Sequence, residues 1–193
     1  MVRFDNFQQL DPDAVNLARE LVGVIADERS AFSSFSHAWM AFNGWMECVS
    51  EEETDAAMLN ALADHPKLVT AYEDLLGMDA TFADSVAEIA ALLPVLSVRD
   101  VRRKLGRDAF SQYERPQLLH EAKCAGVKQQ PRDWTSGTKL TWPELLRTIY
   151  LVRCNLFHGA KSPRNDRDRN LVHACDKILR LFIERTQCFT WHD

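Results

Sequence analysis

One long helix is predicted by residues 141–159, which read TWPELLRTIYLVRCNLFHG. Thr141 is a good N-cap residue, and Gly159 is a residue at which helices commonly end. Between them, apolar side chains recur at helical spacing: Leu145, Leu146, Ile149, Tyr150 and Val152. The segment that closes this helix is Arg153-Cys154-Asn155-Leu156-Phe157-His158. Ionisable side chains therefore gather at the C-terminal end of an otherwise apolar helix.

The stretches on either side predict further core helices. Downstream, Asn165 can cap a last helix with a continuous apolar face: Leu171, Val172, Cys175, Ile178, Leu179, Phe182 and Ile183. Upstream, Asp11 followed by Pro12 marks a helix start. A second N-terminal helix has large side chains at steps of three and four, which is typical of a core helix: Phe32, Phe35, Trp39, Phe42 and Met46.

The middle of the chain is less regular. Residues 51–94 predict two or three short helices, with Gly77 as a stop, and we expect them to form an insertion that packs on the main bundle. Residues 99–104 suggest a short basic helix, and residues 120–140 predict a long polar loop. Gly and Pro number only 7 each, which disfavours many short strands. We predict one all-α domain over residues 1–193, an up-and-down bundle of four to five core helices with an inserted helical segment.

The charges divide unevenly along the chain. Residues 1–98 hold 4 Lys/Arg against 17 Asp/Glu, whereas residues 99–193 hold 19 against 11. A basic half is typical of a polyanion partner, but the two halves could equally neutralise each other across a core or a dimer contact. Neither a membrane span nor a signal-peptide pattern occurs, and the five scattered cysteines include no CxxC pair. These features predict a cytoplasmic protein with reduced thiols.

The block from Tyr150 to Arg169 resembles the HEPN superfamily in its bacterial Arg-x4-His form, of the ApeA-like branch. Four residues separate Arg153 from His158, and the match extends to Asn155, Gly159, Lys161-Ser162-Pro163 and the later Arg167-Asp168. The resemblance is strong over 140–185, fair over 29–46, where it includes Trp39-Met40-Ala41-Phe42-Asn43, and thin between. Cys154 departs from the pattern, because a polar residue often follows the Arg in nuclease members.

The resemblance implies a metal-independent endoribonuclease with no cofactor. In this scheme the 2′-hydroxyl of RNA is the nucleophile, His158 transfers the proton, and Arg153 stabilises the charge that develops on the phosphate. It also implies a homodimer that joins two Arg/His pairs in one cleft. A regular helix turns about 500° over five residues, so Arg153 and His158 point roughly 140° apart within one chain. This geometry fits a site that needs a second chain or a frayed helix end.

The candidate site residues each have a structural alternative. His158 could be a polar helix end, and Arg153 could form an ion pair with Asp166 or Asp168. Asn155, named with them as a catalytic candidate, is expected to bond to backbone or to orient His158. The candidate RNA-binding residues could be solvated surface, but their nearness to the motif favours phosphate binding: Lys161, Arg164, Arg167 and Arg169. No metal-ligand spacing occurs among the histidines.

Three hypotheses follow for function. The first is an endoribonuclease of the toxin–antitoxin or phage-defence kind, which the resemblance alone implies. The second is a non-catalytic HEPN module that binds RNA, a nucleotide or a partner protein. The third is a protein neutralised by an antitoxin that binds its acidic N-terminal half.

Overall fold

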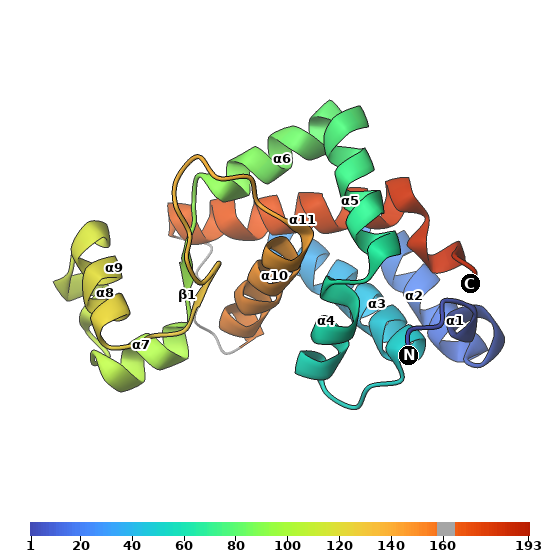
Figure 1. Ribbon diagram of the computed structural model, residues 1–193, viewed down its shortest axis with the longest axis horizontal. Coiled ribbons are helices and arrows are strands. Elements are labelled where there is room, and N and C mark those ends of the chain that lie inside the picture. The colour runs from blue at the N-terminus through green and yellow to red at the C-terminus, as the bar shows by residue number, and fades with distance from the viewer. Residues whose placement is uncertain (158–164) are drawn as a thin grey trace.

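The computed structural model describes residues 1–157 and 165–193, and it confirms an all-α helical bundle (Figure 1). Its centre is formed by α2 (Pro12–Ile25), α3 (Ala31–Ser50) and α11 (Asp166–Thr186). Helix α3 packs against both α2 and α11, and α11 runs along most of the length of the molecule (Figure 1). The predicted caps at Asp11 and Asn165 are confirmed, because Asp11 accepts from Ala14 N and Asn165 accepts from Asp168 N.

The aromatic stripe of α3 forms the centre of the core, as the sequence predicts. Phe35, Phe42 and Met46 of the predicted stripe are fully buried, whereas Phe32 is only partly buried. The ring of Phe42 meets the edge of Phe182 from α11 at 6.2 Å, and Phe182 in turn stacks on Trp142 at 4.5 Å. This stack joins α3, α11 and the start of α10, so the three helices that carry the predicted motif and its surroundings share one hydrophobic core.

Helix α10 (Trp142–Phe157) is the motif helix. At its start, the carboxylate of Glu144 accepts hydrogen bonds from both the backbone N and the hydroxyl of Thr141. The helix contacts α4, α5, α11 and both short strands. Near its C-terminal end, Arg153 reaches Asp55 at the start of α4, and Asn155 reaches the backbone of Leu96.

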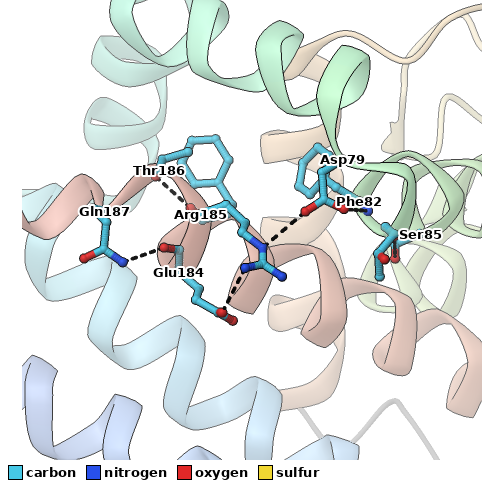
Figure 2. Close-up of polar contacts among 9 residues, drawn as sticks. Asp79, Phe82, Ser85, Glu184, Arg185, Thr186 and Gln187 are labelled. Atoms are coloured by element: carbon cyan, nitrogen blue, oxygen red, sulfur yellow. Dashed lines mark hydrogen bonds and ion pairs between the residues drawn. The ribbon is translucent and has the colours of Figure 1, made fainter.

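The insertion consists of α4 (Asp55–Ala63), α5 (Pro66–Met78) and α6 (Ala80–Ala90). Helix α5 continues one residue past Gly77, the predicted stop, and ends at Met78. The next residue, Asp79, caps α6 by accepting from Phe82 N at 3.0 Å. Figure 2 shows that the same carboxylate accepts from Arg185 Nε at the C-terminal end of α11, at 3.2 Å. One side chain thus starts α6 and ties the insertion to the bundle.

A small subdomain stands at one end of the molecule (Figure 1). It consists of α7 (Val98–Lys104), α8 (Ala109–Gln112) and α9 (Arg115–Cys124), packed around a second hydrophobic cluster. The strands β1 (Val95–Leu96) and β2 (Gln129–Gln130) pair antiparallel at its base, with Val95 opposite Gln130. The basic helix predicted at 99–104 is therefore confirmed as part of α7.

The segment 120–140 is only partly the loop that the sequence predicts. Residues 120–124 belong to α9, and residues 129–130 form β2. The helix extends into this segment because Leu118 and Ala122 bury their side chains one turn apart in the second cluster. The remaining residues of the segment lie outside regular secondary structure, apart from turns.

The ends of the described chain lie side by side. Helix α1 (Asp5–Gln9) packs near the 3-10 helix η1 (Cys188–Thr190). Phe4 N donates to Asp193 at 2.8 Å, and the Phe4 ring packs edge-on against Trp191. Across residues 1–157 and 165–193, every helix is too short or too polar to cross a membrane.

Candidate functional site

The C-terminal half of α10 presents two different faces. Tyr150, Arg153, Cys154 and Phe157 follow a spacing of three, four and seven residues, so they share one side of the helix. Asn155 points elsewhere, towards β1 and α7. We call the four-residue side the Arg153 face. His158, Lys161 and Arg164 belong to the predicted site but lie outside the described residues.

Arg153 is held between an acid and a ring. Its Nη1 lies 3.4 Å from Oδ2 of Asp55, and its guanidinium lies 4.7 Å from the centre of the Phe157 ring. The side chain is 27% exposed, and its Nε is buried without a hydrogen-bond partner among the described residues. The guanidinium is therefore fixed in place while part of it remains accessible from solvent.

The acid that pairs with Arg153 comes from a distant part of the sequence. Asp55 is the first residue of α4, directly after the N-cap Thr54, and is 98 positions from Arg153. Asp166, one of the two partners expected from the sequence, pairs with Arg169 at 2.7 Å. The expectation of a nearby partner was therefore wrong for Asp166, because α4 folds back on α10 and supplies the closer carboxylate.

Asn155 is part of the framework of the fold. It is 4% exposed, its Oδ1 accepts from Val98 N at 3.0 Å, and its Nδ2 donates to Leu96 O at 2.9 Å. These bonds satisfy the last residue of β1 and the first residue of α7. The amide is thus engaged with backbone, which was one of the two roles that the sequence suggested for it.

A Tyr–Cys pair completes the Arg153 face. Tyr150 and Cys154 lie one helical turn apart on this face, and the Tyr150 ring lies 5.9 Å from that of Trp39 on α3. Burial, reinforced by the neighbouring Cys154 side chain, raises the pKa of the Tyr150 phenol, so this hydroxyl stays protonated at neutral pH. Cys154, the residue that departs from the nuclease pattern, therefore packs against a neutral phenol on the motif helix.

The basic residues after the motif differ in their environments. Arg169 is exposed and bound to Asp166. Arg167 turns into the fold, where its Nη2 donates to Leu92 O at 2.6 Å and approaches Pro94 O at 3.4 Å. Burial lowers the pKa of Arg167, with Asp168 opposing this effect. Arg115 from α9 also donates to Pro94 O, so the structure brings together two guanidinium groups 52 positions apart.

Sequence reasoning missed both Asp55 and Arg115. Each lies in a segment with no recognisable motif, and only the folding of α4 and α9 back onto the ends of α10 and α11 gives them a role.

Comparison with protein-family models, with curated proteins and with solved structures finds no match to this chain.

Proposed function

We propose that this chain is a metal-independent endoribonuclease of HEPN type. The observation that supports it best is the placement of Arg153, a half-buried and fixed guanidinium in the last turn of a core helix that leads directly into His158. A guanidinium held in this way is ready to bind a phosphodiester through two parallel hydrogen bonds. The all-α bundle agrees with what the resemblance implies for the fold.

In the proposed reaction His158 transfers a proton and Arg153 stabilises charge on the phosphorus. The RNA supplies its own nucleophile, the 2′-hydroxyl, which attacks the adjacent phosphate and expels the 5′-oxygen, leaving a 2′,3′-cyclic phosphate. A positioned proton-transfer group accelerates such a step by about 10²–10⁴. Phosphate binding competes with Asp55 for Arg153, so Asp55 holds the guanidinium in its working position until substrate arrives.

The ion pair also supports a second candidate. If Arg153 serves only to join α10 to α4 through Asp55, the chain is a non-catalytic HEPN module that binds RNA, a nucleotide or a partner protein. The full use of the Asn155 amide in backbone bonds agrees equally well with this alternative. Toxin–antitoxin or phage-defence biology, a homodimer and an antitoxin partner remain parts of the proposal that the resemblance alone suggests.

Cleavage of end-labelled RNA separates these candidates. We expect cleavage by the wild-type chain with chelator present, a rate loss of about 10²–10⁴ for His158→Ala, and a comparable loss for Arg153→Ala. A substrate with a single 2′-deoxyribose before the scissile phosphate should bind but resist cleavage. Arg153→Lys should not restore the rate, because an ammonium lacks the planar fork.

Arg147 provides the matched control. It lies on the same helix and also pairs with an acid of the α4 region, Asp64, at 3.8 Å, but it is outside the motif. Arg147→Ala should cleave at the wild-type rate. If Arg147→Ala and Arg153→Ala reduced the cleavage rate equally, the cause would be the loss of the contact between α10 and α4 and not the loss of phosphate binding. Normal cleavage by His158→Ala would exclude this mechanism.

A further inference from the structure

A cleft of about 490 Å³ lies between the small subdomain and the start of α11. Its walls are apolar residues around β1 and α9 together with three arginines from three different helices: Arg102 of α7, Arg115 of α9 and Arg167 of α11. Glu114 and Asp168 also line it. We call this the arginine cleft. It lies next to the backbone that Asn155 holds, but it shares no residue with the Arg153 face.

Two of these arginines share one backbone acceptor. Arg115 Nη2 and Arg167 Nη2 both donate to the carbonyl oxygen of Pro94. Neither guanidinium belongs to any ion pair found within residues 1–157 and 165–193. Each guanidinium carries five N–H donors, and its bonds to Pro94 and Leu92, among the residues that the structure describes, use only one nitrogen. Within this part of the chain, donors therefore remain on both guanidinium groups.

Two positive charges that are partly buried close to each other repel, and this costs free energy unless an anion binds between them. Burial, together with the charge of Arg167, lowers the pKa of Arg115 to about 10, so Arg115 remains cationic at neutral pH. Arg102, which also lines the cleft, adds a third and exposed cation. The lining contains three arginines and two acidic residues, so it is net positive, and its donors come from three separate helices.

We infer that the arginine cleft binds a phosphate group. The fork geometry of arginine matches phosphate oxygens, and a ligand that contacts all three arginines would join α7, α9 and α11. The apolar walls would contact the sugar or base attached to that phosphate. This inference goes beyond RNA cleavage, since it depends only on the cleft and holds whether or not the Arg153 face is catalytic.

Isothermal titration calorimetry at constant ionic strength tests the inference. The probes are inorganic phosphate, adenosine 5′-monophosphate, and a single-stranded DNA hexamer with and without a 5′-phosphate. DNA is chosen because it lacks the 2′-hydroxyl and so cannot report on cleavage. We expect Arg115→Gln and the surface variant Arg102→Gln each to weaken phosphate-probe binding roughly tenfold or more. Arg107→Gln, an exposed arginine of the same subdomain outside the cleft, should leave it unchanged.

The probes also identify the source of the phosphate. A requirement for the 5′-phosphate on the hexamer assigns the cleft to terminal phosphates, and equal binding of both hexamers assigns it to the strand backbone. Arg102→Gln keeps the test valid if Arg115→Gln unfolds the subdomain. Failure of every probe to bind the wild-type chain at millimolar concentration, or equal weakening by Arg107→Gln, would overturn the inference. RNA cleavage can persist in either case, so the two proposals fail separately.

Discussion

The buried amide of Asn155 joins α10, β1 and α7 through two backbone hydrogen bonds. Its removal would leave the N–H of Val98 and the carbonyl of Leu96 buried without partners. We therefore predict that Asn155→Ala lowers the free energy of unfolding by about 2–3 kcal/mol, measured by urea denaturation.

Asn170 is the control for that change, because it is exposed on α11. Asn170→Ala should leave stability unchanged or slightly raised, since Ala has the higher helix propensity. If Asn155→Ala were as stable as wild type but lost RNA cleavage, Asn155 would have a catalytic role instead of the framework role described here.

Asp176 is a carboxylate inside the core, 4% exposed, that accepts from Ser34 at 2.6 Å and lies 3.6 Å from Arg180. Burial raises its pKa above the unfolded value of about 3.9. Its contribution to stability is then full below that value and is lost as the pH rises through the folded pKa. We predict that the stability of wild type relative to Asp176→Asn falls as the pH is raised from about 4 towards 7, measured by denaturation at each pH. A relative stability that rises over this range would contradict the prediction.

For single residues, the sequence indicates which side chains are capable of catalysis or binding, but it does not indicate which other side chains they contact. The spacing of Arg153 and His158 is visible in the chain, whereas the pairing of Arg153 with Asp55 depends on how α4 returns to α10. The same limit applies to Arg115 and Arg167, which meet at Pro94 only because α9 folds back.

Among the elements, Asp79 connects the insertion to the bundle by capping α6 and pairing with Arg185 (Figure 2). We predict that Asp79→Ala lowers stability by about 1–2 kcal/mol, mostly through the lost cap, because the half-exposed Arg185 gains little from its ion pair. Thermal or urea denaturation measures the change.

Asp79→Ser separates the two roles, because serine caps a helix nearly as well as aspartate but carries no charge. It should cost about 1 kcal/mol or less. A loss as large as that of Asp79→Ala would show that the ion pair, and not the cap, attaches the insertion.

The helices were largely predictable because their caps and apolar periodicity are local signals, as at Asp11, Asn165 and the α3 stripe. The strands were not predictable, because β1 and β2 contain only two residues each, too few to show the alternation of apolar and polar residues that marks a strand. The small subdomain was missed for a related reason: α8 has four residues, and its cluster is assembled from several separate segments.

For the molecule as a whole, the proposed function requires two Arg153 faces to meet. Phe157 is 51% exposed on that face, beside Arg153. We predict that the chain is a dimer in light scattering at micromolar concentration. Phe157→Ser should weaken the dimer about 10²-fold or more, because each copy of a symmetric dimer loses the buried ring.

Leu17 is the comparison, an apolar side chain 54% exposed on α2. Leu17→Ser should leave the dimer intact. Dissociation by Leu17→Ser but not by Phe157→Ser would place the dimer contact on α2 and leave the Arg153 faces apart. A monomeric wild-type chain that still cleaves RNA would rule out the shared site.

The contact between α3 and α11 also has a consequence for biosynthesis. Ser34 and Asp176 are bonded across 142 positions, and the aromatic face of α3 is covered by Phe182 of α11. At roughly 5–20 residues per second, a ribosome would make that face about 7–30 s before its cover. A nascent chain of this protein therefore carries exposed aromatic surface for many seconds, which is a reason for chaperones to bind it during translation.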